Sequence, residues 1–513
     1  DFRVMIHKIH SGGVLPSVAA GGVYGIYGAN NTFVNFTSIV FPQDTRNCQA
    51  CHNVNDPNTP QASNYTTVIS RQACTSCHDN LNFTTGANHG SGVVATDDEC
   101  ASCHGPNSTL NNGYLRPELA HLVPEEQAAQ KFKFEVVKVE AVKVDGTPGA
   151  TACAAGTVGC KVLPGEYAKV TIRVSNPATG TLYKITDAPF TNTVPCTPVP
   201  PATSCTPTAA RLRVRVAYTT QNFVNRASGN YPAQPILIDF LSAAAAPSGA
   251  PIASGGLPTL NADGTYTKVA AVPIAAGLVG GTGEAFLEGR VVVDVSRYGS
   301  VANLQAVGPD SSAGVLYPIT DSTPVARRAI VDVAKCDACH HRLTAHGSNR
   351  TNNTELCAAC HNPENANGTT VATGQPFDFK FLIHGIHNAS YNFGGLSFQN
   401  VLFPGNIANC TGCHVAGGFY PVNPFLVFAT SFTQGLDPTA PTDDIARSPN
   451  AAACSACHNG SYASAHMQLY GAAFAATKNP DGSSVASTQE QCGLCHGAGG
   501  YMDVAVLHGI SGN

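Results

Sequence analysis

The motif Cys-x-x-Cys-His occurs eight times in this 513-residue chain and constrains the fold more than any other feature of the sequence. With 20 Cys and 18 His in the chain, chance predicts about 0.03 copies. Two cysteines on one short turn can form thioethers to the vinyl groups of one porphyrin, and the histidine that follows becomes the proximal ligand of the iron. Zinc ligand pairs and redox dithiols do not require a histidine after every second cysteine. The sequence therefore predicts eight covalently attached haem c groups.

Each motif supplies two attachment cysteines and one proximal ligand. The predicted attachment cysteines are Cys48, Cys51, Cys74, Cys77, Cys100, Cys103, Cys336, Cys339, Cys357, Cys360, Cys410, Cys413, Cys454, Cys457, Cys492 and Cys495. The predicted proximal iron ligands are His52, His78, His104, His340, His361, His414, His458 and His496.

The chain has only three methionines, so His/Met ligation could serve few of the haems, and most sixth ligands are expected among the ten remaining histidines. We therefore expect mostly bis-histidine haems. His341 directly follows the proximal His340 and can hardly reach across the same ring, so we interpret it as a solvated or propionate-bonded side chain. The candidate distal ligands are His7, His10, His89, His121, His346, His384, His387, His466 and His508.

An internal repeat relates the two ends of the chain. DFRVMIHKIH at residues 1–10 matches DFKFLIHGIH at residues 378–387, and IVFP before Cys48 matches VLFP before Cys410. The three N-terminal motifs thus correspond to the last three C-terminal ones. Three haems then have four candidate distal ligands, so we expect His7 or His10 to serve a haem outside this chain, carried by an upstream segment or a neighbouring subunit.

Composition indicates the cellular compartment in which the protein works and excludes some classes of partner. Charged residues make up 12% of the chain, the formal net charge is -5, and no basic stripe indicates nucleic-acid binding. Four further cysteines, Cys153, Cys160, Cys196 and Cys205, form two close pairs, which predicts two local disulfides and an oxidising compartment. No apolar run is long enough for a transmembrane segment. Because no leader precedes Asp1, we expect a signal peptide to have been removed.

Patterning divides the chain into three predicted domains: a trihaem domain at 1–130, an all-β domain at 131–327 and a pentahaem domain at 328–513. The middle region alternates apolar and polar residues, as in Val170, Ile172 and Val174. Other predicted strands are RLRVRVAY, FKFEVVKV, PILIDFL, TYTKVAAV and RVVVDV. The haem segments have few periodic apolar runs, so we expect porphyrin faces to replace side chains as buried apolar surface, with short helices around each motif.

Several longer stretches carry a family resemblance. ARRAIVDVAKCDACHHRLTAHGSNR, CAACHNP and FLIHGIH in the C-terminal region, GTGEAFLEGR at 281–290 and the Cys196/Cys205 pair resemble the OmcA/MtrC family of outer-membrane multihaem cytochromes. The resemblance implies Greek-key split β-barrel domains alternating with pentahaem domains. This chain departs from the ten-haem pattern because it lacks the first β domain, the first two haems and an N-terminal lipid-anchoring cysteine.

The functional prediction is an octahaem electron conduit that is secreted or held at the cell surface. The resemblance implies electron transfer through closely spaced haems to metal oxides, flavins, electrodes or other cytochromes. One alternative is a subunit of a conducting filament built from copies of the chain. A second alternative is a multihaem enzyme of the nitrite or hydroxylamine type, which needs an open iron. Because candidate histidines outnumber haems, we expect no dedicated catalytic site.

Overall fold

The computed structural model describes residues 1–196, 205–218, 220–225, 234–276, 280–295, 303–370, 374–393, 396–420, 426–437, 440–484 and 489–510. The chain forms two compact units. The first contains Asp1–Gln127, Asp294–Gln305 and Ala338–Arg342. The second contains Ala128–Val293, Ala306–Asp337 and Leu343–Asn513.

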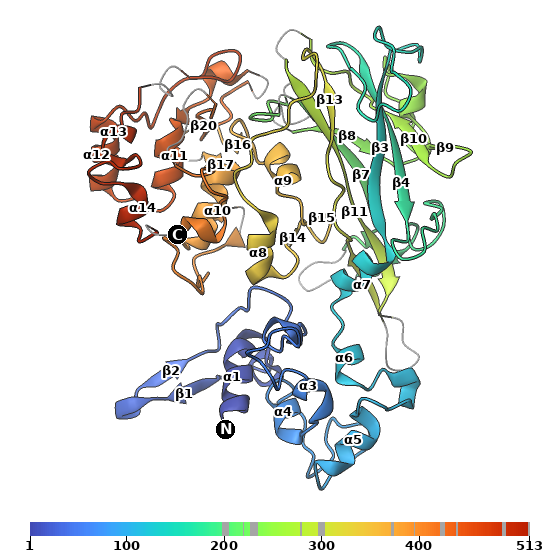
Figure 1. Ribbon diagram of the computed structural model, residues 1–513, viewed down its shortest axis with the longest axis vertical. Coiled ribbons are helices and arrows are strands. Elements are labelled where there is room, and N and C mark those ends of the chain that lie inside the picture. The colour runs from blue at the N-terminus through green and yellow to red at the C-terminus, as the bar shows by residue number, and fades with distance from the viewer. Residues whose placement is uncertain are drawn as a thin grey trace. The chain divides into compact units, whose positions relative to one another are not determined.

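The first unit consists of short helices, loops and one β-hairpin (Figure 1). Helix α1 (Phe2–His10) begins at Asp1, whose carboxylate accepts a hydrogen bond from the backbone N–H of Arg3 at 3.0 Å. Two histidines three residues apart, His7 and His10, lie at the end of this helix. The other elements are α2 (Pro16–Ala19), α3 (Asn64–Thr67), α4 (Arg71–Thr75), α5 (Asp98–His104), α6 (Pro117–Ala120) and the antiparallel strands β1 (Gly25–Tyr27) and β2 (Phe33–Asn35).

The second unit contains two main sheets, which follow helix α7 (Pro124–Lys131). One sheet has the strand order β3-β4-β10-β9, and the other has β12-β11-β7-β8 with β13 also paired to β11. Their strands are β3 (Lys133–Val142), β4 (Tyr167–Ser175), β7 (Arg211–Tyr218), β8 (Ile236–Asp239), β9 (Thr259–Leu260), β10 (Tyr266–Val269), β11 (Thr282–Asp294), β12 (Leu304–Val307) and β13 (Val315–Pro318). A separate two-stranded sheet joins β5 (Thr193–Val194) to β6 (Thr208–Ala209).

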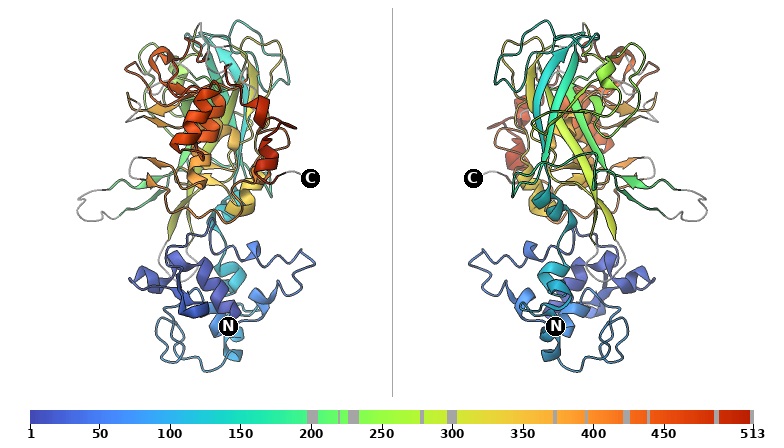
Figure 2. Two further views of the ribbon diagram at one scale, coloured as in Figure 1. Left: turned by 90° about the vertical axis from the view of Figure 1, so that its left-hand side faces the viewer. Right: turned by 90° about the vertical axis from the view of Figure 1, so that its right-hand side faces the viewer.

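Side chains from both sheets form one apolar core. Val170 and Ile172 of β4 and Leu212 and Val214 of β7 are fully buried in it. Burying one such side chain contributes about 1.5–3 kcal/mol. Figure 1 labels the long strands of these sheets, β3, β4, β7 and β11, and Figure 2 shows the same ribbon from two other sides.

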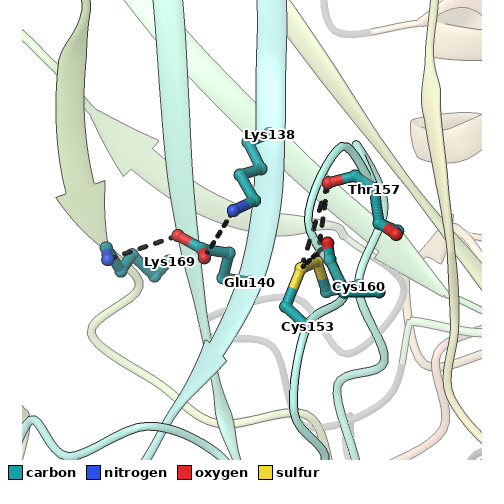
Figure 3. Close-up of a disulfide and its surroundings, with 7 residues drawn as sticks. Lys138, Glu140, Cys153, Thr157, Cys160 and Lys169 are labelled. Carbon is teal, nitrogen blue, oxygen red and sulfur yellow. Dashed lines mark hydrogen bonds and ion pairs between the residues drawn. A yellow bond between two sulfur atoms is a disulfide. The ribbon is translucent and has the colours of Figure 1, made fainter.

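Disulfides join Cys153 to Cys160 and Cys196 to Cys205. Figure 3 shows the first of these beside Thr157, whose backbone carbonyl oxygen lies 3.9 Å from the sulfur of Cys153 and 3.8 Å from that of Cys160. In the same view, Glu140 of β3 accepts from Lys138 at 2.8 Å and from Lys169 at 3.3 Å.

The C-terminal part of the chain consists of short helices and two-stranded sheets. Helix α10 (Phe379–His387) matches α1, because Asp378 caps it through the backbone N–H of Lys380 and two histidines lie near its end. Its other helices are α8 (Val333–His340), α9 (Thr354–Cys360), α11 (Pro449–Ser455), α12 (Ser461–Leu469), α13 (Gly493–His496) and α14 (Val504–Leu507). The sheets pair β14 (Thr344–Ala345) with β15 (Arg350–Thr351), β16 (Ala366–Asn367) with β17 (Gln375–Pro376), β18 (Asn392–Phe393) with β19 (Leu396–Ser397) and β20 (Thr430–Ser431) with β21 (Ala446–Arg447).

The predicted fold class is confirmed: the chain is multidomain, with short helices in the haem-motif segments and antiparallel strands in the middle region. The two main sheets remain separate in the part of the chain that the structure describes, so no closed barrel forms there. Within the described residues, none of the helices combines the length and the apolar character that crossing a bilayer requires.

Candidate haem sites

Each Cys-x-x-Cys-His motif is wound into about one helical turn. In six motifs the backbone N–H of the histidine donates to the carbonyl oxygen of the first cysteine at 2.7–2.9 Å, as His361 does to Cys357. The remaining two motifs end helices α5 and α8. This turn brings both cysteines and the histidine to one side of the backbone, which is the arrangement that attachment to a single porphyrin needs.

Seven predicted proximal histidines each face a predicted distal histidine. The ring centroids of the pairs are 6.0–6.4 Å apart. Metal–imidazole bonds are about 2 Å long, so the centroids of two imidazoles on opposite sides of one iron lie about 6 Å apart. The pairs are His52–His7, His78–His121, His104–His89, His361–His346, His414–His384, His458–His508 and His496–His466.

Backbone carbonyls orient many of these rings through Nδ1. Among the predicted proximal ligands, His104 donates to the carbonyl oxygen of Leu115 at 2.7 Å and His361 donates to that of Phe377 at 2.9 Å. Among the predicted distal ligands, His121 donates to Pro117 and His508 to Val504, both at 2.9 Å. A carbonyl oxygen can only accept, so Nδ1 carries the proton and the lone pair lies on Nε2. Metal-binding histidines are typically held in this way.

Burial keeps several of these imidazoles neutral, which is the form that binds iron. The pKa of His384 is lowered to about 4 by burial, with the neighbouring His414 and His387 adding to the effect. The pKa of His346 is also lowered to about 4, by burial and by the positive charge of Arg350. The residues therefore fit haem c: they supply thiols, neutral imidazoles and a distance that accommodates one iron.

Three further predicted ligands make other contacts. The eighth proximal residue, His340, donates from Nδ1 to the carbonyl oxygen of Pro42 at 3.1 Å within the first unit. His387 donates to Ile383 at 2.9 Å, and its ring contacts Phe403 edge-on at 5.5 Å. His10 repeats this arrangement, with Nδ1 on the carbonyl oxygen of Ile6 at 2.9 Å and an edge contact to Phe41 at 5.4 Å.

His341, which was not predicted to be a ligand, lies beside Glu126: its Nε2 is 3.0 Å from the Glu126 Oε1. The solvated or propionate-bonded state of His341 stays a prediction.

Sequence reasoning missed the groups that orient the ligands. The carbonyl that accepts from His414 belongs to Ile330, 84 residues earlier in the chain. An ion-pair cluster of Arg215, Glu288 and Arg350 lies beside the His346–His361 pair and was also missed. No motif indicates either feature, because both depend on how distant segments pack.

Cys-x-x-Cys-His turns, seven of which have a second histidine facing the motif histidine, define a multihaem c-type cytochrome, a class of electron-transfer proteins. The chain belongs to the outer membrane cytochrome MtrC/MtrF-like family: the family model for domains II/IV matches residues 1–111 and 328–509, more than half of the chain.

The fold is similar to two solved cytochrome structures. The crystal structure of MtrC from Shewanella baltica OS185 matches with a TM-score of 0.55 and 16% identity, over 96% of this chain and 67% of that one. The outer membrane decaheme cytochrome OmcA matches with a TM-score of 0.59 and 18% identity, over 100% of this chain and 68% of that one. No curated protein sequence matches the chain.

Proposed function

We propose that this chain is an octahaem cytochrome that conducts electrons at the exterior of the cell, to extracellular acceptors or to partner cytochromes. When bound, haem c supplies reversible one-electron oxidation and reduction. The observation that carries the proposal is the set of seven histidine pairs at 6.0–6.4 Å, because a pair of this kind occupies both axial positions of an iron. Membership of an outer-membrane cytochrome family supports the location at the cell surface.

The sequence repeat offers a distal ligand for every motif of the C-terminal domain. That domain has five candidate distal histidines, His346, His384, His387, His466 and His508, for five motifs. The domains that we propose are a trihaem domain at 1–130, a β domain at 131–327 and a pentahaem domain at 328–513. By the same repeat, the trihaem domain has one candidate histidine more than it has haems.

Ferric spectra test this function directly. Bis-histidine iron is low-spin, so the purified protein should show low-spin electron paramagnetic resonance (EPR) and visible spectra, and its intact mass should exceed the polypeptide mass of 53.0 kDa by eight haems. A clear high-spin fraction in fresh protein would contradict the conduit and support the enzyme of the nitrite or hydroxylamine type. That enzyme needs an iron with an exchangeable axial position, which paired histidines do not provide.

A conducting filament is a second candidate, since only 12% of the residues are charged and low surface charge favours self-association. Negative-stain electron microscopy at high protein concentration distinguishes the two. Uniform single particles would exclude the filament and leave the proposed conduit unchanged.

A further inference from the structure

The haem site formed by Cys357, Cys360, His361 and His346 is held by the β sheet. Glu288 of strand β11 is 1% exposed and lies between two arginines. Its Oε1 is 2.9 Å from Nε of Arg215 on β7, and its Oε2 is 2.5 Å from Nε of Arg350 on β15. We refer to Arg215, Glu288 and Arg350 as the arginine cluster.

Strand β11 also holds the loop that carries His346. This residue lies in the turn between β14 and β15. The backbone N–H of Gly289 donates to the carbonyl oxygen of Asn349 at 2.9 Å, and Nη1 of Arg290 donates to that of Gly347 at 2.7 Å. The distal histidine is thus positioned by hydrogen bonds from the same strand that carries Glu288.

The proximal side of the site is attached to the sheet as well. Helix α9, which leads to His361, contributes Leu356, Ala358 and Ala359 to a buried cluster with Phe286 of β11. Nδ2 of Asn225 donates to the carbonyl oxygen of Ala359 at 2.7 Å. Figure 1 shows α9 beside the strands of this sheet. Both ligands of the site are therefore fixed relative to the arginine cluster.

The charge in this region is positive. Two guanidinium groups and one carboxylate leave the arginine cluster with one excess positive charge. Arg290 adds another, since its Nε donates to the carbonyl oxygen of Ala209 rather than to an acid. Burial would raise the pKa of Glu288, but Arg215 and Arg350 lower it, so the carboxylate stays ionised. Of the three members, Arg350 acts most strongly on His346.

We propose that the arginine cluster raises the reduction potential of the haem held by His346 and His361. With the cluster present, this haem stays reduced at potentials at which it would otherwise be oxidised. Each electron gained lowers the charge at the iron by one, and a nearby cation stabilises that product. The effect is strong where water is excluded, and reduction potentials of haems respond to charge and burial. Arginine keeps its charge at any physiological pH, so the bias is fixed.

The inference rests on the proposed bis-histidine haems, and a set of charge variants tests it. Arg350→Gln removes a positive charge and should lower the midpoint potential of one haem in eight by at least 59 mV, a tenfold change in its reduction equilibrium. Glu288→Gln removes the negative charge and should raise it. Arg350→Lys keeps the charge and should restore most of the potential. The matched control is Arg173→Gln, which breaks a comparable Arg–Glu pair of 2.9 Å with Glu135 on the β3-β4 sheet.

The measurement is an electrochemical titration of the full holoprotein followed by visible absorption, with the ferric spin state recorded for every variant. Opposite shifts in Arg350→Gln and Glu288→Gln, with no shift in Arg173→Gln, support the inference. Unchanged potentials in a low-spin protein, or shifts of the same sign in both variants, overturn it while leaving the proposed function intact. If Arg350→Gln loses its low-spin haem, Glu288→Gln decides alone: a rise supports the inference, and a fall or no change overturns it. A high-spin wild-type protein would instead reject the proposed function.

Discussion

His7 and His10 lie one turn apart on α1 and differ in what they face. The ring of His7 lies 6.2 Å from that of His52, whereas the ring of His10 contacts Phe41. The sequence repeat predicts that one of the two is spare, and the pairing with His52 identifies His10 as that residue. The Nδ1 of His10 nevertheless donates to the backbone carbonyl oxygen four residues earlier, as the Nδ1 of the paired His121 does.

The two alanine variants should therefore behave differently. His7→Ala should convert one haem in eight to a high-spin form, because the iron of His52 loses its sixth ligand. His10→Ala should leave the spectrum of the isolated chain low-spin. The spin state is measured by EPR on the ferric protein. A high-spin signal in His10→Ala would show that His10 binds one of the eight irons of this chain and would refute the inference from the repeat that His10 is spare.

The candidate ligands follow from local features of the sequence. The Cys-x-x-Cys-His spacing predicts the proximal histidines, and the repeated segments that begin at Asp1 and Asp378, both of which cap a helix, each contain a His-x-x-His pair. The partner of each distal histidine could not be predicted, since His121 pairs with His78, 43 residues earlier, rather than with the nearer His104. That choice depends on chain packing, which sequence spacing does not report.

Strand β11 shows why one element was only partly predicted. Its last residues, RVVVD, belong to the predicted strand RVVVDV, but the preceding Gly283, Glu284, Glu288 and Gly289 do not follow a strand pattern. Both glycines are needed: a Cβ on Gly283 would lie 2.2 Å from the Tyr317 ring, and one on Gly289 would lie 2.2 Å from the Arg211 carbonyl oxygen. Regular alternation predicted β7 in full and residues 169–174 of β4.

Glu284 makes the stability of this element depend on pH. Burial raises the pKa of its carboxyl to about 7, with the negative charge of Glu355 adding to the effect and Arg327 opposing it. The folded protein therefore binds this proton more tightly than the unfolded chain does. Its contribution to stability is complete below about pH 4.5 and is lost as the pH rises through 7.

Glu284→Gln should remove this pH dependence. Between pH 5 and pH 8 the wild type should lose about 2 kcal/mol more of its free energy of unfolding than the variant does. Urea unfolding followed by circular dichroism measures the difference. Glu135→Gln serves as control, because the pKa of Glu135 is lowered by Arg173 and Lys133 despite its partial burial, so its titration falls below this pH range. Equal slopes for wild type and Glu284→Gln would contradict the prediction.

At the scale of the whole molecule, the haem sites differ in their surroundings. The angle between the two imidazole planes of a pair ranges from 14° at His7–His52 to 84° at His466–His496. Cys360 is buried, whereas Cys51 and Cys495 are exposed. Exposure, ligand orientation and neighbouring charge all set haem potentials, and bis-histidine ligation keeps them low.

A reductive titration of the intact protein should accordingly extend over a broad, low range of potential. The visible α band followed against electrode potential gives the curve. One sharp wave at high potential would contradict the prediction, because it would require eight equivalent irons. EPR of partly reduced samples offers an independent check, since sites with near-parallel and near-perpendicular imidazoles give different low-spin signals.

The distribution of apolar side chains determines how such a chain must be produced. The larger of the two clusters of buried apolar residues lies between Ala128 and Ile319, and the other joins that region to helix α9; within the described residues, the segment from Asp1 to Gln127 contributes to neither of them. Its helices run four to nine residues, too short to be stable alone. Attachment of the prosthetic group is then also the folding step for that segment. A polypeptide released from the maturation machinery with one attachment missing would remain locally unfolded there and would be cut by proteases first. Degradation would then remove the incomplete molecules, so that the surviving ones carry every haem.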